Sequence, residues 1–179
     1  MGKVFESIDD DLAAWIDQQA MFFVSTAPIA SDGLINCSPK GLDSFLVLEP
    51  KAVAYLDITG SGIETVAHLQ ENGRIVLMFC AFTGPCKIVR LHGTGVFHGL
   101  ESERFGELKN QFTEHPGTRG IIEVSLTRIS DSCGYGVPKY DFVEQRETLI
   151  KASINKGEAG LAEYRQLKNA SSLDGLPGI

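Results

Sequence analysis

The sequence predicts a mainly β (α+β) protein, a small antiparallel β-barrel with peripheral helices. Six strand-like runs follow one another within about 110 residues, and Gly, Pro, Asp and Asn residues separate them. The last run alternates, because Ile122, Val124 and Leu126 share one face while polar residues occupy the other. The six runs are Met21 to Ala27, Leu34 to Lys40, Ala52 to Asp57, Arg74 to Phe82, Lys87 to Phe97 and Ile121 to Ile129.

Helices are expected before, between and after these strands. Ser7, followed by three aspartates, opens an amphipathic helix that carries Leu12, Trp15 and Ile16. The other expected helices run from about Ile63 to Gln70, Ser102 to Phe112, Glu144 to Asn155 and Glu158 to Asn169. The chain is therefore expected to be one domain, residues 1–179, with a barrel core at about 21–129 and a helical C-terminal extension at about 139–169.

The composition excludes several classes of partner. The 179-residue chain has a mass of 19.4 kDa and carries 16 Lys and Arg against 23 Asp and Glu, a formal net charge of −7. An acidic chain without a long basic block does not suit nucleic acid or an anionic membrane surface. The apolar runs are far shorter than the roughly 20 residues that span a bilayer. The N-terminus has neither a signal-peptide stretch nor a myristoylation motif, so a cytoplasmic protein is expected.

The sequence holds no motif for metal binding or nucleophilic catalysis. Its four histidines fall on different predicted elements and form no HExxH set, so no metal site is expected. Its four cysteines form no CxxC pair and are expected to be free thiols. There is no GxSxG nucleophile elbow, and Cys133 has no histidine near it in the sequence. A hydrolase is therefore disfavoured, and the residues identify no catalytic group.

One candidate for ligand binding is the polar face of the second predicted strand. Strand parity places Asn36, Ser38 and Lys40 on one face, so that a row of hydrogen-bonding side chains ends at a cation. The same pattern also describes the solvated outer surface of a barrel, and the residues alone leave both interpretations open.

A second candidate is the turn after the third predicted strand, Thr59-Gly60-Ser61-Gly62, which leads into a helix. Free N–H groups at a helix start can hold a phosphate. The turn lacks the GxxxxGK[ST] spacing of a P-loop. Ser61 and Glu64 also fit a capping box, in which each side chain binds the other residue's backbone N–H. Capping alone would explain both residues.

Arg90 is a third candidate, on the fifth predicted strand. It shares a face with Ile88, His92 and Thr94 and could pair with a phosphate or a carboxylate. An exposed strand arginine without a ligand fits the same parity.

Several segments occur in an order that resembles the pyridoxamine 5'-phosphate oxidase family. They are Asn36 to Gly41, Tyr55 to Gly62, Asn72 to Phe79, Arg90 to Gly95, Ser132 to Pro138 and Asp174 to Gly178. The resemblance covers about residues 21–129, and the last two segments resemble one bacterial branch of the family. It implies a split β-barrel homodimer that holds FMN at the subunit interface.

The resemblance also implies the residues of a flavin site. Polar residues of the second strand, the end of the third strand and its turn would bind the cofactor. These are Asn36, Ser38, Lys40, Asp57, Thr59, Gly60, Ser61 and Gly62. The oxidase has an Arg-Lys pair at the start of the following helix, where this chain has Ile63-Glu64-Thr65. Phosphate binding is therefore expected to depend on Lys40, Arg90 and backbone N–H groups.

A flavin carries its own redox chemistry, which accounts for the lack of a catalytic motif. The basic C-terminal residues with which the oxidase holds pyridoxal phosphate have no counterpart in residues 175–179. We therefore expect an FMN-dependent oxidoreductase of unidentified substrate rather than a true pyridoxamine phosphate oxidase. Two alternatives remain open. One is a non-catalytic protein that binds or stores a flavin, a deazaflavin or haem, and the other is a barrel dimer without a cofactor.

Overall fold

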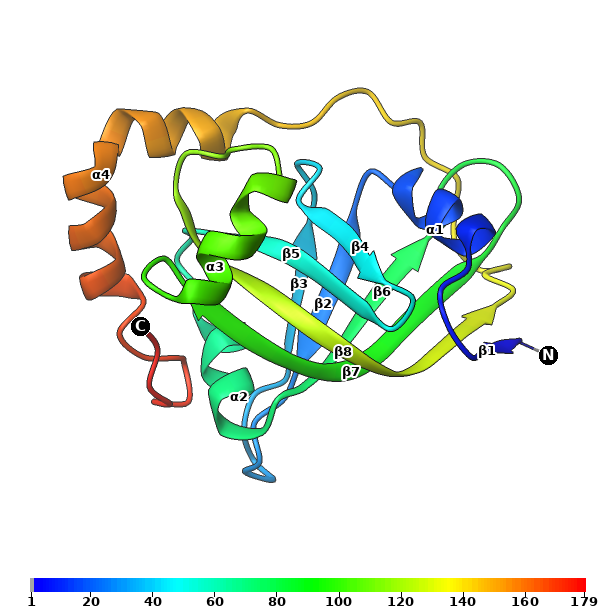
Figure 1. Cartoon of the computed structure of the whole chain (residues 1–179), viewed down its shortest axis with the longest axis horizontal. Coiled ribbons are helices and arrows are strands. Elements are labelled where there is room, and N and C mark those ends of the chain that lie inside the picture. The colour runs from blue at the N-terminus through cyan, green and yellow to red at the C-terminus, as the bar shows by residue number, and fades with distance from the viewer. Residues whose placement is uncertain (1) are drawn as a thin grey trace.

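The computed structural model describes residues 2–179, in which all strands join one antiparallel sheet (Figure 1). The strand order is β3-β2-β6-β7-β8-β5-β4, and the short β1 pairs with β8. The strands are β1 (Val4–Phe5), β2 (Phe22–Thr26), β3 (Asn36–Lys40), β4 (Phe45–Glu49), β5 (Ala52–Ile58), β6 (Arg74–Cys80), β7 (Ile88–Gly99) and β8 (Thr118–Ser132). The helices are α1 (Asp10–Asp17), α2 (Glu64–Asn72), α3 (Glu103–Leu108), the short 3-10 helix Lys109–Gln111 and α4 (Thr148–Lys168).

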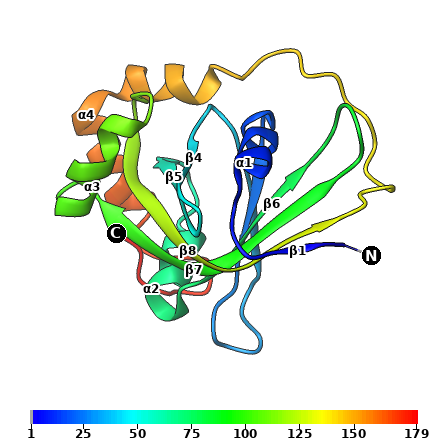
Figure 2. The same cartoon turned by 45° about the vertical axis from the view of Figure 1, so that its right-hand side comes forward.

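The sheet bends into two arms, which confirms the predicted split β-barrel. Figure 2 shows the long strands β7 and β8 curving so that β6 and β5 rise on either side of α1. Two strands were not predicted. Phe45–Glu49 has a continuous apolar sequence without alternation, yet it pairs with β5 as a hairpin around Pro50. The two-residue β1 is too short to give a sequence pattern.

Two apolar clusters lie on opposite faces of β5 and β8, because neighbouring residues of a strand point to opposite sides. Tyr55 and Ile122 face the interior of the barrel, where Leu12 and Ile16 of α1 close one end. The side chains of the second cluster lie on the other face, beneath α3. They are Ala54, Leu56, Leu108, Phe112 and Ile121.

The predicted helices are present, with shifted ends. The N-cap of α1 is Asp9, whose carboxylate accepts the N–H of Leu12 at 2.9 Å, so the helix begins two residues later than a cap at Ser7 would set it. Gly73 ends α2 in the left-handed region, at φ 71°, which only glycine adopts readily. The two helices expected in the extension form α4, interrupted at Gly157 (φ 62°, ψ 177°).

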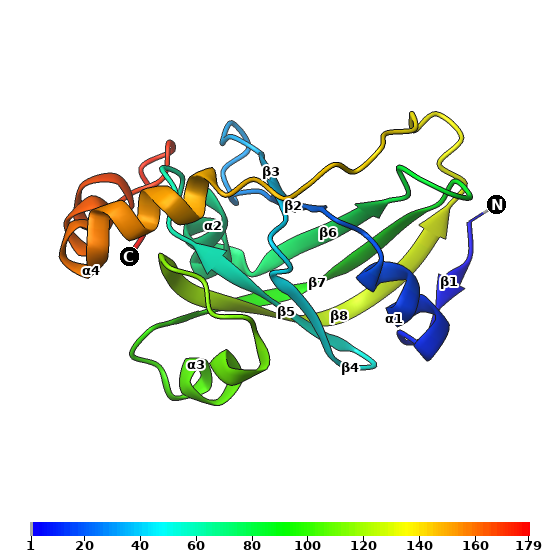
Figure 3. The same cartoon turned by 90° about the horizontal axis from the view of Figure 1, so that it is seen from above.

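The extension crosses the molecule before α4 begins. Figure 3 shows residues 133–147 passing from the end of β8 over the sheet to the opposite side, where α4 lies. Gln145 Nε2 donates to the carbonyl of Ala20 at 2.9 Å, and the Tyr140 N–H donates to the carbonyl of Phe82 at 3.0 Å. Within residues 2–179 there is no helix with the length and apolarity that crossing a membrane requires.

His68 of α2 makes the stability of the fold depend on pH. The side chain is wholly buried, and its Nδ1 lies 2.9 Å from Thr26 Oγ1. Its Nε2 has no hydrogen-bond partner among the described residues. Burial lowers the pKa of His68 below its ordinary 6.5, so the unfolded chain binds this proton more tightly than the folded chain does.

We therefore predict that the free energy of unfolding decreases as the pH falls below about 6.5. His68→Gln keeps a polar group near Thr26 and removes the titration, so the variant should lose less stability over the same range. Burial and the nearby Arg128 and Arg90 also lower the pKa of His92, so a part of the dependence should remain. Urea unfolding above and below pH 6.5 measures both slopes, and equal slopes for wild type and variant would contradict the assignment to His68.

Candidate functional site

A buried carboxylate lies where edge strand β3 approaches the end of β5 across the split of the barrel. Asp57, near the end of β5, is wholly buried, and Lys40, at the end of edge strand β3, places its Nζ 3.6 Å from Asp57 Oδ1. The lysine side chain is 23% exposed. Because β3 and β5 are not paired in the sheet, this contact links the two sides of the split.

Arg119 compensates the charge of Asp57 from the neighbouring strand. Its Nε donates to Asp57 Oδ2 at 2.6 Å and its Nη2 to Oδ1 at 3.3 Å. Asp57 pairs with Gly120 whereas Ile58 pairs with Thr118, so Arg119 is the extra residue of a β-bulge. A bulge re-aims a side chain that regular alternation would send to the opposite face. Both side chains are almost fully buried, which makes this a desolvated, two-point ion pair.

Asn169, the residue after α4, connects this ion pair to the turn between β5 and α2 (residues 59–63, here the β5–α2 turn). Its Oδ1 accepts Arg119 Nη1 at 2.9 Å, and its Nδ2 donates to the carbonyls of Gly60 and Ser61 at 3.0 and 3.4 Å. The C=O and N–H of a trans peptide unit point in opposite directions. The N–H groups of Ser61 and Gly62 therefore point away from Asn169.

The N–H of Thr59 donates to the carbonyl of Gly117 at 2.8 Å, but the backbone donors that follow it in the β5–α2 turn are free in the described structure. No N–H group of residues 60–66 donates a hydrogen bond to any part of the chain that the structure describes. The predicted capping box is absent, because α2 has Ile63 as its N-cap and no side chain caps it. A Cβ placed on Gly60 would meet no atom within 4 Å, so there is open space beside the turn. Unpaired N–H groups at a helix start attract anions.

Arg165 of α4 adds a further cation at this turn. Its Nε donates to Thr59 Oγ1 at 2.9 Å and its Nη2 to the carbonyl of Thr118 at 3.1 Å. No carboxylate of the described residues forms an ion pair with it. Burial, together with the nearby Arg119, lowers the pKa of Arg165, as expected for a cation that no acid compensates.

The charges at this place favour a negatively charged ligand. Lys40, Arg119 and Arg165 bring three positive charges, and Asp57 brings one negative charge. We call these four residues the Asp57 cluster. Glu64 opposes it, since its carboxylate approaches the turn at Gly62, where a Cβ would lie 2.6 Å from Glu64 Oε2. Because the chain has a formal net charge of −7, this local excess of cations does not follow from its overall composition.

The other predicted residues of β3 connect the strand to α2. Asn36 Nδ2 donates to Thr65 Oγ1 at 3.0 Å, and Ser38 Oγ donates to Asn36 Oδ1 at 3.0 Å. The structure thus brings the polar face of β3, Asp57 and the β5–α2 turn to one region, as the resemblance implies.

Arg90 lies apart from this region. Pro39 pairs with Phe23, Phe23 with Met78 and Met78 with Arg90, so these residues share one face of the sheet. Lys40 lies on the opposite face. Arg90 Nη1 donates to Ser132 Oγ at 3.0 Å. The structure therefore separates Arg90 from the Asp57 cluster.

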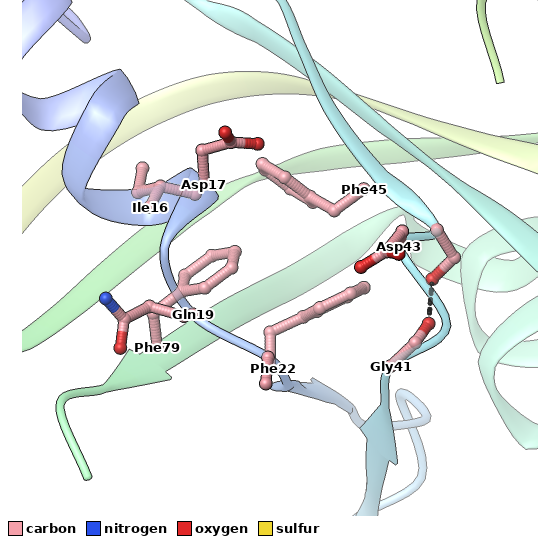
Figure 4. Close-up of a pocket in the computed structure, with 10 residues that line it drawn as sticks. Ile16, Asp17, Gln19, Phe22, Gly41, Asp43, Phe45 and Phe79 are labelled. Carbon is pink, nitrogen blue, oxygen red and sulfur yellow. Dashed lines mark hydrogen bonds between the residues drawn. The ribbon is translucent and has the colours of Figure 1, made fainter. Parts of the chain in front are cut away.

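A small pocket of about 290 Å³ opens next to the end of β3, between α1 and the β3–β4 loop (Figure 4). Figure 4 shows the rings of Phe22, Phe45 and Phe79 around it and the carboxylates of Asp17 and Asp43 at its rim. Two larger cavities, of about 960 and 520 Å³, lie elsewhere. Lys40 and residues 59–62 line none of these three spaces, whereas Arg165 of the Asp57 cluster lines the cavity of about 960 Å³.

Three residues of this region were not predicted. Arg119 is placed by a bulge, and Arg165 and Asn169 reach the turn from a helix more than 100 residues along the chain. The sequence offered one weak signal, an arginine directly before the glycine that opens an apolar run, Arg119-Gly120-Ile121-Ile122.

Comparisons with known proteins agree with this fold. The family model described as pyridoxamine 5'-phosphate oxidase matches residues 8–133. The chain is 41% identical over 194 residues to ustO, a pyridoxamine 5'-phosphate oxidase family protein of Aspergillus flavus, covering 98% of this chain and 77% of that protein.

Two solved structures resemble the chain in fold. HupZ of Group A Streptococcus has a TM-score of 0.52 at 18% identity, covering 68% of this chain and 91% of its own. The FAD binding protein of Mycobacterium smegmatis has a TM-score of 0.50 at 13% identity, covering 73% of this chain and 96% of its own.

The ion pair of Asp57 gives a stability prediction. Arg119→Gln leaves a buried carboxylate with only the half-buried Lys40 nearby and should lower the free energy of unfolding by about 3 to 5 kcal/mol. Lys40→Gln leaves the Asp57–Arg119 pair intact and should change it by about 1 kcal/mol or less. Urea unfolding of both variants measures the difference. Equal losses would show that Arg119 is not the main compensating charge.

Proposed function

Because the chain belongs to the pyridoxamine 5'-phosphate oxidase family, we propose that it binds FMN and acts as a flavin-dependent oxidoreductase. The observation that carries the proposal is the row of unpaired N–H groups at residues 60–66 beside the cations of the Asp57 cluster. The FAD-binding protein among the structural neighbours supports a flavin. A terminal phosphate, as in FMN, suits donors that gather at one turn.

Each residue of the site would have a defined part in binding. The N–H groups of Ser61 and Gly62 would donate to the phosphate, because Asn169 holds the carbonyls of Gly60 and Ser61 on the other side. Lys40 and Arg165 would add charge, in place of the Arg-Lys pair that Ile63 and Glu64 replace. Asp57, Arg119 and Asn169 would hold the turn in position. FMN, when bound, supplies the electron transfer, so the chain has to bind and orient it.

We further propose a homodimer, with the flavin between two copies. None of the three spaces described above is lined by both Lys40 and the β5–α2 turn, and a Cβ on Gly60 would meet no atom within 4 Å, so the turn has open space beside it. A second copy would enclose the ring and exclude water from it. The sheet face that carries Phe23, Met78 and Arg90 is a suitable contact surface, because it lies opposite the face that packs Val24, Leu77 and Leu91 into the core.

Light scattering or sedimentation at micromolar concentration tests the dimer. We expect a mass near twice the 19.4 kDa of the chain. A mass near 19.4 kDa, with or without FMN, would contradict the proposed assembly.

Lys40→Ala tests phosphate recognition. One charge-assisted hydrogen bond contributes about 1.5 to 3 kcal/mol, so the affinity for FMN should fall by about ten- to a hundredfold. The affinity for riboflavin, which lacks the phosphate, should change little. Fluorescence titration of both ligands measures this, with Lys51→Ala, an exposed lysine of the β4–β5 turn, as the matched control.

Glu64→Gln should change the affinity for FMN in the opposite direction to Lys40→Ala. It removes the negative charge beside Gly62 and should strengthen FMN binding without affecting riboflavin. Equal changes for the two ligands in either variant would place the phosphate elsewhere, with Arg90 as the next candidate. A wild-type protein that is colourless as purified and does not bind added FMN would contradict the proposed function.

A further inference from the structure

The largest of the three cavities, about 960 Å³, lies between α4 and the segment that runs from α3 to Thr118. Figures 1 and 2 both show α3 and α4 at the same end of the molecule. The cavity lies on the face of β5 that carries Leu56, which is the face opposite to Tyr55 and Asp57. It therefore lies on the other face of β5 from Asp57, although Arg165, which lines it, also contacts Thr59 of the β5–α2 turn.

Two glycines shape this cavity. Gly117 has φ 87°, and a Cβ there would collide with Ser153 Oγ, so the loop approaches the first half of α4 closely. Gly157 breaks α4 at φ 62° and lines the cavity, so that both halves of the helix contribute to its wall. Each glycine adopts a backbone conformation that L side chains rarely adopt, and each faces the same space.

The lining combines an apolar base with a charged rim. Leu56, Phe112 and Leu161 are buried and line the cavity. Charged side chains of both signs, Lys109, Glu114 and Glu158, are exposed at its edge. A volume of this size lies within the range of about 300 to 1,000 Å³ in which proteins bind small organic molecules.

Arg165 gives the inner part of the cavity a positive charge. Its Nε and Nη2 are used by Thr59 and Thr118, but its Nη1 has no hydrogen-bond partner in the described part of the chain and remains accessible to solvent. Within residues 2–179 no carboxylate pairs with it, whereas the acids that line the cavity lie exposed at the rim. An uncompensated, half-buried guanidinium favours an anionic group.

We propose that this cavity binds a small molecule with an apolar body and a single anionic group, such as an aromatic or medium-chain carboxylate or sulfonate. The apolar body packs against Leu56, Phe112 and Leu161, and the anionic group meets Arg165 Nη1. This site goes beyond the proposed flavin site, since it lies on the Leu56 face of β5, shares only Arg165 with that site and needs no bound flavin.

Fluorescence titration with 1-anilinonaphthalene-8-sulfonate, which has apolar rings and one sulfonate, tests the proposal. Ile154→Trp fills the cavity from α4, and the matched control Leu167→Trp adds the same side chain to an exposed position of α4 that does not line it. Arg165→Gln removes the cation, with the exposed Lys168→Gln as its control. Decanoate, 1-decanol and decylamine compete with the probe, and circular dichroism checks that each variant is folded.

We expect saturable binding of one probe per chain. Ile154→Trp and Arg165→Gln should each weaken it by about tenfold or more, and their controls should leave it unchanged. Decanoate should displace the probe at concentrations at least about tenfold below those of the alcohol and the amine. Ile154→Trp should leave the FMN affinity unchanged. Binding of the probe in this cavity can therefore be tested whether or not the protein binds FMN. No saturable binding, equal effects of Ile154→Trp and Leu167→Trp, or equal competition by the amine would overturn the proposal.

Discussion

The buried carboxylate of Asp57 is the constraint on which the arrangement of the site depends. A charge taken out of water between β5 and β3 is stable only if other charges and hydrogen bonds compensate it. Arg119 meets this requirement because a β-bulge turns its side chain towards Asp57, and Lys40 approaches from edge strand β3. The remaining donor of Arg119 binds Asn169, which in turn fixes the β5–α2 turn. The contacts that compensate this one charge at the end of β5 therefore connect edge strand β3, the β5–α2 turn and the end of α4.

This constraint also gives the region its chemical character. Compensating one carboxylate with two cations, and adding Arg165, leaves a surplus of positive charge beside a turn whose N–H groups are unpaired. The carbonyls of that turn are held by Asn169, which orients its donors towards the open side. In the proposed flavin site, Lys40 and Arg165 would take the place of the missing Arg-Lys pair. The negative charge of Glu64 opposes these cations, so we expect it to lower the affinity for FMN.

The fold could be predicted well from the sequence, and the site only in part. Alternation and turn residues located six strands, while the continuous apolar Phe45–Glu49 gave no strand period. Lys40 and the β5–α2 turn were found because both lie at ends of predictable elements. Arg119 was missed because a bulge overrides strand parity, and Arg165 because nothing in the pattern of α4 shows what its C-terminal half contacts. The capping box that Ser61 and Glu64 would form is absent, because α2 has Ile63 rather than Ser61 as its N-cap.

In the proposed site, the free N–H groups of residues 60–66 bind the phosphate of FMN. Amide chemical shifts of the ¹⁵N-labelled protein, titrated with FMN and separately with riboflavin, test this binding mode. We expect the difference between the two ligands to be concentrated in the amides of residues 60–66 and in the side-chain signals of Arg165. A difference concentrated around Arg90 and Ser132, or no difference between the ligands, would contradict it.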